Sequence, residues 1–214
     1  MTRSAVILAG GLSSRLGQDK GLLQLDGKPL VRYVLNTVDN IVDEKIVVVS
    51  GKGQVEKYLN EVGARTKIVV DKTDARSPLA GAMTGFEEAL GEYSLLLPCD
   101  TPFISRDILL LLLELCAFRN ACVPRWPNGH VEPLQAVYRT KPALEASNAA
   151  FCAKGLNMQA MLSRLQCVRY VSTLVLEQLD SELRTFFNIN TPQDLERAKL
   201  ALGYQRPQGY TLSK

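Results

Sequence analysis

Positions 9–20 read A-G-G-L-S-S-R-L-G-Q-D-K, a run that combines glycines, serines and two basic side chains, Arg15 and Lys20. Glycine lets backbone N–H groups approach a ligand closely, and the two cations attract phosphate oxygens. The common phosphate loops do not match, because G-x-G-x-x-G needs glycines two apart and G-x-x-x-x-G-K-[ST] needs a glycine where this chain has Asp19. The run therefore predicts a phosphate-binding loop of another kind.

Polar side chains also follow the other apolar runs of the first hundred residues. Ser50 and Gly51 follow one run, Asp71 follows the next, and Asp100 comes soon after a fourth. Because the carboxyl ends of parallel strands share one edge of a sheet, we expect these side chains to line a ligand-binding crevice. Carboxylates beside a basic, glycine-rich loop predict a polyphosphate bound with magnesium.

The elements that position these residues alternate along the chain. Short apolar runs at 5–9, 45–50, 66–70 and 94–98 predict parallel strands buried on both faces. Amphipathic helices are predicted over 29–38, around 55–62, over 78–90 and from 105 to about 118. In two of them the helical spacing selects these apolar residues: Val55, Tyr58, Leu59 and Val62; Leu79, Met83, Phe86 and Leu90. The alternation predicts a doubly wound α/β fold.

The last third of the chain is less regular. Strands are predicted over 120–126, 134–139, 168–172 and 186–190, and helices over 142–151 and 156–165. A final helix begins with Thr191 as N-cap, Pro192 at the first helical position and Asp194 in the first turn. We expect a single domain over residues 1–202 and a mobile tail over 203–214.

Composition excludes several classes of protein. The 214 residues are 46% hydrophobic and 22% charged, and a net charge of +3 is too small and scattered to indicate a nucleic-acid partner. No run reaches the roughly 20 apolar residues that span a bilayer, and no signal-peptide pattern is present, so we expect a cytoplasmic protein without a membrane partner. The five cysteines lack zinc-ligand spacing and predict reduced thiols in or near the core, while His130, the only histidine, has no G-x-S-x-G partner.

Three segments together resemble the signatures of the molybdenum cofactor guanylyltransferases. They are L-A-G-G-L-S-S-R-L-G-Q-D-K-G-L-L-Q-L-D-G-K-P-L at 8–30, P-C-D-T-P-F-I at 98–104 and N-I-N-T-P-Q-D-L-E-R-A at 188–198, in that family's order. The first alone marks only the wider nucleotidyltransferase superfamily. The resemblance covers about residues 5–202 and implies a Rossmann-like, doubly wound, mostly parallel sheet in a three-layer α/β/α domain.

The resemblance also implies a reaction: GMP passes from GTP to the phosphate of molybdopterin, giving a guanine dinucleotide cofactor and pyrophosphate, with Mg²⁺ as the metal. Transient contacts with other cofactor-assembly proteins and with molybdoenzymes are further implications. The implied catalytic residues are Arg15, Lys20 and Asp100, with Asp100 on the metal. The implied nucleotide contacts are Leu8, Ala9, Gly10, Gly11, Lys20, Ser50, Asp71, Leu79 and Asp100, and the implied acceptor contacts are Asn188 and Asn190.

The residues fit nucleotidyl transfer on chemical grounds as well. An acceptor phosphate oxygen attacks the α-phosphorus in line while pyrophosphate leaves, so the protein contributes positioning and charge stabilisation. The acceptor phosphate is already ionised, so no general base is required. Arg15 and Lys20 would offset charge on the leaving pyrophosphate.

Structural alternatives stay open for the charged candidates: a solvated side chain for Lys20, a surface ion pair for Arg15, a helix cap or turn for Asp100 and a strand-ending turn for Asp71. Ser50 stands where relatives often have asparagine, and Ser77 where they commonly have glycine. Other functions also stay open: a related enzyme that uses CTP on the same pterin, one that acts on a sugar 1-phosphate or other small phosphate, or a non-catalytic cofactor-delivery protein.

The acceptor side is the least determined by the sequence. Asn188 and Asn190 either contact the acceptor or only form the turn before the final helix. Trp126 and His130 could face the pterin, although Trp126 could equally pack in the fold. Glu132 stands where several relatives have histidine before a Pro-Leu pair, so we expect the acceptor pocket to differ from theirs.

Overall fold

A seven-stranded sheet forms the centre of the molecule, with strand order β11-β9-β10-β8-β1-β6-β7. The computed structural model describes residues 1–10, 12–13, 18–73, 75 and 77–205. The strands are β1 (Arg3–Leu8), β6 (Glu44–Val49), β7 (Thr66–Val70), β8 (Tyr93–Pro98), β9 (Ala121–Arg125), β10 (Ala136–Arg139) and β11 (Val168–Ser172). Only β10 runs antiparallel to its neighbours within this sheet, so the predicted mostly parallel sheet is confirmed.

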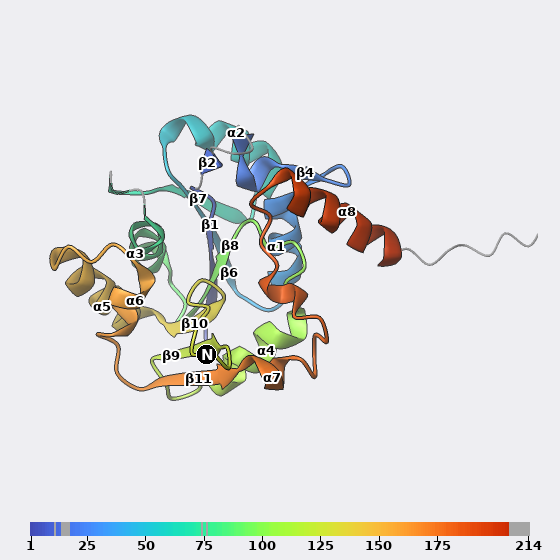
Figure 1. Cartoon of the computed structure of the whole chain (residues 1–214). Coiled ribbons are helices and arrows are strands. Elements are labelled where there is room, and N and C mark those ends of the chain that lie inside the picture. Colours follow the sequence, from blue (N-terminus) through green and yellow to red (C-terminus); the bar gives the residue numbers. More distant parts are fainter. Residues whose placement is uncertain (11, 14–17, 74, 76, 206–214) are drawn as a thin grey trace, which may run out of the picture.

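Helices cover both faces of the sheet, as the predicted three layers require (Figure 1). Their bounds are α1 (Leu30–Val38), α2 (Lys52–Val62), α3 (Pro78–Glu88), α4 (Arg106–Leu115), α5 (Thr140–Cys152), α6 (Met158–Leu162), α7 (Thr173–Leu176) and α8 (Pro192–Gln205). Alternate strand residues point to opposite faces. Val6 and Val48 pack beneath α3, whereas Ile7 and Val47 pack with α1 and α4.

The order β7-β6-β1-β8 contains the switch point of the fold. The chain runs outward from β1 through β6 to β7 and then returns to place β8 on the other side of β1. Open α/β sheets bind ligands at such a reversal, outside the carboxyl ends of the strands. This edge therefore positions the loops that follow Leu8, Val49, Val70 and Pro98.

The expectation that every strand of the first hundred residues is buried on both faces is wrong for β7. This strand is at the edge of the sheet, so Lys67 is exposed and Ile68, Val69 and Val70 are only partly buried. The apolar run of β7 resembles that of a central strand because partial burial between α2 and α3 is enough to favour aliphatic side chains.

The structure corrects two residues predicted on apolar helix faces and one predicted helix end. Leu59 is 58% exposed, because α2 packs near the edge of the sheet and buries only Tyr58 and Val62 fully. Leu90 is 86% exposed, because Ala89 is extended and α3 has already ended at Glu88. Phe118 is 91% exposed and has a positive φ of 60°, since α4 ends at Leu115.

The predicted strand over 186–190 is wrong. The 3-10 turn η2 (Arg184–Phe186) leads into a loop that does not join the sheet. Ile189 is buried in a separate apolar cluster, and its N–H donates to the carbonyl of Asp100 at 2.9 Å. The alternating pattern therefore reflects packing of a loop against the site edge and not a sheet ladder.

The beginning of α8 is confirmed, but its end is not where we expected it. The Thr191 hydroxyl accepts from the Asp194 N–H at 3.2 Å, and the Asp194 carboxylate accepts from the Thr191 N–H at 2.9 Å, which is a reciprocal cap. The helix continues to Gln205, so Gly203 is helical and does not begin a tail. Residues 206–214 of the expected mobile tail lie outside the described part of the chain.

Several short elements were not predicted. The two-residue strands β2 (Leu12–Ser13) and β3 (Gln18–Asp19) pair with each other, as do β4 (Gln24–Leu25) and β5 (Lys28–Pro29). The 3-10 turn η1 (Lys20–Leu22) lies between the two pairs. In the described part of the chain, no helix is long and apolar enough to cross a membrane.

Candidate active site

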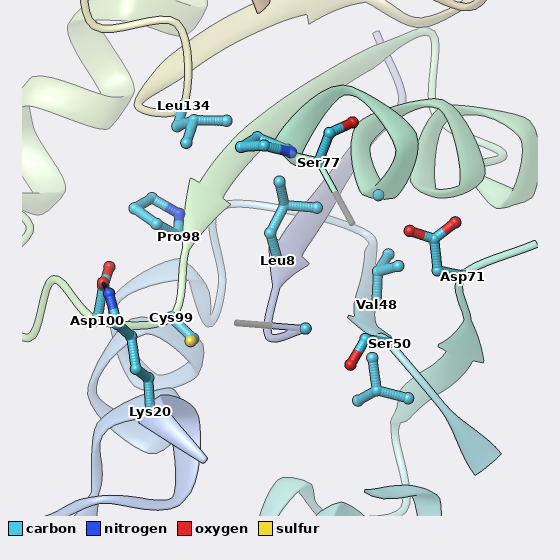
Figure 2. A pocket seen from close by; sticks show the side chains of 14 residues that line it. Leu8, Lys20, Val48, Ser50, Asp71, Ser77, Pro98, Cys99, Asp100 and Leu134 are labelled. Carbon is cyan, nitrogen blue, oxygen red and sulfur yellow. Dashed lines mark hydrogen bonds and ion pairs between the residues drawn. The ribbon is translucent and has the colours of Figure 1, made fainter. Parts of the chain in front are cut away.

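A cavity of about 400 Å³ lies at the carboxyl edge of the sheet, beside the switch point. Figure 2 shows Leu8 near its middle, with Asp71 and Ser50 on one side and Lys20 and Asp100 on the other. Its lining residues are Leu8, Gly10, Lys20, Val48, Val49, Ser50, Asp71, Ser77, Pro78, Gly81, Pro98, Cys99, Asp100 and Leu134. We call it the first cavity.

Most of the nucleotide-contact candidates line the first cavity: Leu8, Gly10, Lys20, Ser50, Asp71 and Asp100. Ala9 and Leu79 do not line it, and both are completely buried in the core. Gly11 and Arg15 lie outside the described residues, so their predicted roles stay predictions.

A second cavity of about 660 Å³ adjoins the first and shares Asp100 with it. It contains the two acceptor candidates, Asn188 and Asn190, together with the loop that carries His130 and Glu132. Asp100 therefore lies where the predicted nucleotide side meets the predicted acceptor side.

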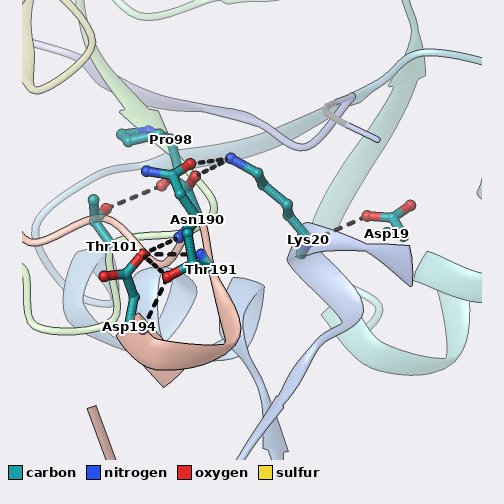
Figure 3. Close-up of polar contacts among 9 residues, drawn as sticks. Asp19, Lys20, Pro98, Thr101, Asn190, Thr191 and Asp194 are labelled. Carbon is teal, nitrogen blue, oxygen red and sulfur yellow. Dashed lines mark hydrogen bonds and ion pairs between the residues drawn. The ribbon is translucent and has the colours of Figure 1, made fainter. Parts of the chain in front are cut away.

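Lys20 joins the two cavities through its ammonium group (Figure 3). Its Nζ donates to Asp100 Oδ2 at 3.0 Å and to Asn190 Oδ1 at 2.5 Å, so residues 80 and 170 positions away converge on one cation. The side chains of Lys20 and Asp100 are 21% and 12% exposed. The structure therefore contradicts the alternatives of a solvated Lys20 and a helix-capping Asp100. Asp100 does lie in a turn after β8, and Asn190 lines the second cavity.

The position of Lys20 depends on its neighbour Asp19. Asp19 Oδ1 accepts from the Gly21 N–H at 3.1 Å and from the Tyr58 hydroxyl at 2.6 Å, while Asp19 Oδ2 accepts from Gln54 Nε2. Burial raises the pKa of the Tyr58 phenol, so the group stays protonated and donates. Three neutral donors thus hold the Asp19 carboxylate at the start of η1.

The end of β6 joins the same network. The backbone N–H and the hydroxyl of Ser50 both donate to Gln54 Oε1, each at 2.8 Å. Gly10 packs against this residue, since a Cβ on Gly10 would lie 3.1 Å from Ser50 Cβ and 3.2 Å from Ser50 N. A glycine at position 10 therefore lets the ends of β1 and β6 approach each other at the cavity floor.

Asp71 forms the strand-ending turn and also lines the first cavity, so the turn is confirmed and its nucleoside contact stays a prediction. Its Oδ1 accepts from the Thr73 N–H at 3.1 Å, from the Thr73 hydroxyl at 3.3 Å and from the Thr84 hydroxyl at 3.1 Å. A Cβ on Gly81 would lie 3.9 Å from Asp71 Oδ2. The missing side chain at Gly81 keeps space beside this carboxylate oxygen.

The amino-terminal end of α3 also borders the first cavity. Ser77 caps this helix, its hydroxyl accepting from the Ala80 N–H at 3.2 Å, and Ser77, Pro78 and Gly81 line the cavity. The serine that stands where relatives commonly have glycine therefore serves as the helix cap. A helix amino terminus favours anionic groups, so this wall adds to the positive potential of the site.

The donor set allows a divalent cation only together with substrate phosphates. Among the described residues, no group of three or more His, Cys, Asp or Glu side chains could hold a metal ion. Magnesium sites of phosphate-handling enzymes use one or two carboxylates plus the phosphates themselves. Asp100, which lines both cavities, fits that pattern.

The described thiols and the histidine do not form a nucleophilic site. Cys99 lines the first cavity, but burial and then the charge of Asp100 raise the pKa of its thiol well above the ordinary value, so a thiolate is disfavoured. His130 is 67% exposed on its side chain and lies 3.7 Å from Glu132. Contrary to the core placement expected for all cysteines, Cys152 and Cys167 are exposed.

Trp126 packs in the fold and does not line the second cavity. Its ring contacts Phe186 edge to face at 5.6 Å between centroids, and its Nε1 donates to Glu132 Oε1 at 2.7 Å. His130 does line the second cavity. Of the two residues that could face the pterin, only His130 therefore keeps that possibility.

Comparison with known proteins assigns the chain to a family. The family model described as "MobA-like NTP transferase domain" matches residues 5–168. The chain belongs to this family. It is therefore a nucleotidyltransferase of the molybdenum cofactor guanylyltransferase type, and the predicted enzyme class is confirmed.

Its relatives match it over most of their length. The probable molybdenum cofactor guanylyltransferase of Methanosarcina mazei is 35% identical over 91% of this chain and 88% of its own, and that of Natronomonas pharaonis is 36% identical over 92% and 96%. The solved molybdopterin-guanine dinucleotide biosynthesis protein A from Archaeoglobus fulgidus has a TM-score of 0.79 at 26% identity, covering 94% of this chain and 99% of its own.

A solved structure of another specificity shares the fold alone. The 2-C-methyl-D-erythritol 4-phosphate cytidylyltransferase of Thermus thermophilus has a TM-score of 0.69 at 22% identity over 94% of this chain and 98% of its own. The same scaffold thus serves different acceptors. The acceptor must be argued from the site and not from the fold.

The sequence did not single out the residues that support Lys20. Tyr58 falls in the apolar stripe of α2 and Gln54 in its first turn, so neither has a local chemical signal. Their role depends on contacts with Asp19, 39 and 35 positions away. Asp19 itself lies in the quoted loop, but only as the residue before Lys20.

Proposed function

We propose that the chain transfers GMP from GTP to the phosphate of molybdopterin, forming the guanine dinucleotide cofactor and releasing pyrophosphate. The observation that carries the proposal is the position of Lys20, Asp100 and Asn190 between the two cavities, in a chain of this family. A triphosphate in one cavity and an acceptor phosphate in the other would meet at this point. The names of the relatives support guanine and molybdopterin as the two partners.

The first cavity suits a nucleoside triphosphate, because it has a carboxylate at one end and an ammonium group at the other. The carboxylate of Asp71 at one end can accept hydrogen bonds from the nucleoside, and Lys20 at the other can bind phosphate. Leu8 and Val48 provide apolar surface between them. We therefore propose that the base and ribose lie beside Asp71 and that the phosphates lie beside Lys20.

Catalysis then requires position and charge more than proton transfer. We propose that the Lys20 ammonium leaves its ion pair with Asp100 to bind the triphosphate. Asn190, which accepts from the same ammonium, would orient the Lys20 side chain toward the acceptor phosphate. The acceptor oxygen attacks the α-phosphorus in line, the α–β bridging bond breaks, and pyrophosphate leaves with that electron pair. A bound Mg²⁺ would neutralise phosphate charge and orient the groups in line.

The metal and the cellular setting form part of the proposal. Divalent-metal dependence is general for this class of enzyme, and we propose Mg²⁺ held by Asp100 together with the triphosphate. The protein partners are transient: cofactor-assembly proteins that deliver the pterin and molybdoenzymes that receive the product. Since GTP is consumed, we propose that the reaction takes place in the cytoplasm.

Thermal stabilisation by four nucleotides tests the nucleotide side without the labile pterin. GTP with Mg²⁺ should raise the melting temperature, because a ligand at 100 times its Kd stabilises the native state by about 2.7 kcal/mol. ATP, CTP and UTP should give much smaller shifts. A shift with CTP alone would favour the related cytidylyl enzyme, and no shift with any nucleotide would contradict the proposal.

Product analysis tests the acceptor side. Incubation with GTP, MgCl₂ and molybdopterin should give equal amounts of pyrophosphate and guanine dinucleotide. Asp100→Asn should greatly reduce product formation. Asp107→Asn is its matched control, since Asp107 is an exposed aspartate in the first turn of α4 and lines neither cavity. GTP binding without product formation would support the non-catalytic delivery protein instead.

A further inference from the structure

The second cavity contains two carboxylates at different places in the fold. Asp100 follows β8 and is ion-paired to Lys20, whereas Glu132 belongs to the loop between β9 and β10. In the part of the chain that the structure describes, Glu132 forms no ion pair with a lysine or arginine, and the only ionisable partner within 4 Å is the exposed His130, at 3.7 Å. Its charge is therefore available to a ligand.

Glu132 is held in place from three directions. Its backbone N–H donates to the Pro124 carbonyl at 3.0 Å, and its own carbonyl accepts from the Gln135 N–H at 3.3 Å. Its Oε1 accepts from Trp126 Nε1 at 2.7 Å, and Trp126 is in turn packed against Phe186. A side chain that is only 21% exposed and fixed by a tryptophan N–H loses little conformational entropy when it binds a ligand.

The hydrogen bond from Trp126 leaves most of the acceptor sites of the Glu132 carboxylate unused. An ionised carboxylate offers about four lone-pair sites, and the described residues occupy Oε1 with a single N–H donor. A ligand that presents two parallel N–H donors fits such a group best, since two charge-assisted bonds add both strength and direction. The aminopyrimidinone edge of a pterin, with its exocyclic amine next to a ring N–H, has this arrangement.

We infer that Glu132 determines acceptor specificity by accepting hydrogen bonds from the aminopyrimidinone edge of the pterin. The inference rests on the proposed function, because it places the acceptor phosphate beside Asp100 and the pterin at the Glu132 side of the second cavity. Trp126 is a positioning residue, since it orients the carboxylate and contributes no surface to the cavity.

Trp126 also makes the inference testable, because it is the only tryptophan of the chain and is bonded to Glu132. Pterins absorb at the wavelengths where tryptophan emits, so biopterin bound beside Glu132 should quench the fluorescence. Lumazine differs from unsubstituted pterin only in the oxygen that replaces the amine, so it lacks one of the two donors and should bind at least about tenfold more weakly than pterin. This comparison requires only the wild-type protein.

A pair of variants separates recognition from folding. Glu132→Gln keeps an oxygen for Trp126 but loses the charge, so the Kd for biopterin should rise about tenfold or more and the KM for molybdopterin should rise with it. GTP-induced thermal stabilisation should not change. Glu182→Gln is the matched control, because Glu182 borders a different cavity and is paired with Arg184.

The outcomes distinguish the two proposals. Equal binding of pterin and lumazine, or an unchanged Kd for biopterin in Glu132→Gln, would overturn the role of Glu132 while GMP transfer to molybdopterin persists. A wild-type protein that binds GTP but neither biopterin nor molybdopterin would overturn both the acceptor assignment and the role of Glu132. Loss of pterin discrimination in Glu132→Gln with normal GTP binding would support the inference.

Discussion

The two cavities that meet at Asp100 have different origins in the fold. The first takes most of its polar groups from the ends of β1, β6, β7 and β8 and from the start of α3, so the order of the parallel strands brings them together. The second is bounded mainly by loops, with Glu132 from one and Asn188 and Asn190 from another. A shared scaffold can therefore keep the nucleotide side constant while the loops change the acceptor.

The junction should be the most sensitive point, because it serves both cavities. We expect Asp100→Asn to lower kcat by about 100-fold or more, since it removes both the predicted metal ligand and the anionic partner of Lys20. Steady-state rates of pyrophosphate release measure the loss. The control Asp107→Asn should keep the wild-type rate. A rate for Asp100→Asn within a few-fold of wild type would contradict the assignment of Asp100.

Lys20→Ala should affect the nucleotide side next most strongly. We expect at least a tenfold weaker GTP affinity and a kcat lower by about 100-fold, because the variant removes the ammonium group proposed to bind the phosphates. GTP titrations and initial rates measure the two effects separately. Lys72→Ala is the control, since the ion pairs described for Lys72 are with Glu87 and Glu88 at the surface. An equal loss in that variant would argue against a specific role for Lys20.

Asn190→Ala should separate the two cavities. The variant leaves the first cavity intact but removes one acceptor of the Lys20 ammonium, so we expect kcat to fall about tenfold and the KM for molybdopterin to rise. The GTP-induced thermal shift should stay close to that of wild type. A large loss of GTP binding with normal acceptor KM would show that Asn190 belongs to the nucleotide side.

Tyr58→Phe tests whether the network behind Lys20 matters for function. Removing the hydroxyl leaves Asp19 without a 2.6 Å donor inside the fold, which should cost about 1–3 kcal/mol of unfolding free energy. We expect a modest rise in the KM for GTP and an unchanged KM for molybdopterin. Denaturant unfolding gives the first quantity and kinetics the second; equal changes in both KM values would indicate general loosening of the fold.

The smallest expected effect lies away from both cavities. Glu88 Oε2 and Oε1 accept from Lys67 and Lys72, each at 2.7 Å, and these contacts lower the pKa of Glu88 from 4.5 to about 2. Because the folded-state pKa is the lower one, the pair stabilises the protein above pH 4.5 and loses its effect as the pH falls toward 2.

Glu88→Gln should therefore cost less than about 1 kcal/mol at neutral pH, since solvent screens an exposed pair, and nothing near pH 2. Denaturant unfolding at the two pH values measures the difference between variant and wild type. A cost that persists at pH 2 would show that the side chain acts through packing. Enzyme activity should not change, because Glu88 borders neither cavity.

Local patterns succeeded where a residue's environment follows from its neighbours in sequence. The apolar runs located β1, β6 and β8, and the Thr191–Asp194 pair located the start of α8, because burial and capping leave periodic or adjacent signals. The predictions failed at edges and ends. Leu59 and Leu90 continue a helical spacing, but the sheet edge and the end of α3 leave them exposed.

Residue types and their order along the chain were enough to predict most of the polar lining of the first cavity. A glycine-rich loop with Lys20, and polar residues placed directly after or close behind apolar strands, meet at one edge in any parallel doubly wound sheet, since all such strands end on the same side. Lys20 and Asp100 could be identified for this reason before their contact was known.

Which distant residues contact the predicted ones follows from the tertiary packing and from no local pattern. Tyr58 and Gln54 support Asp19, Asn190 reaches Lys20 from 170 positions away, and Glu132 is fixed by Trp126. These contacts depend on how α2 and the loops pack against the sheet. No local period encodes that packing, because its free energy is shared among residues far apart in the chain.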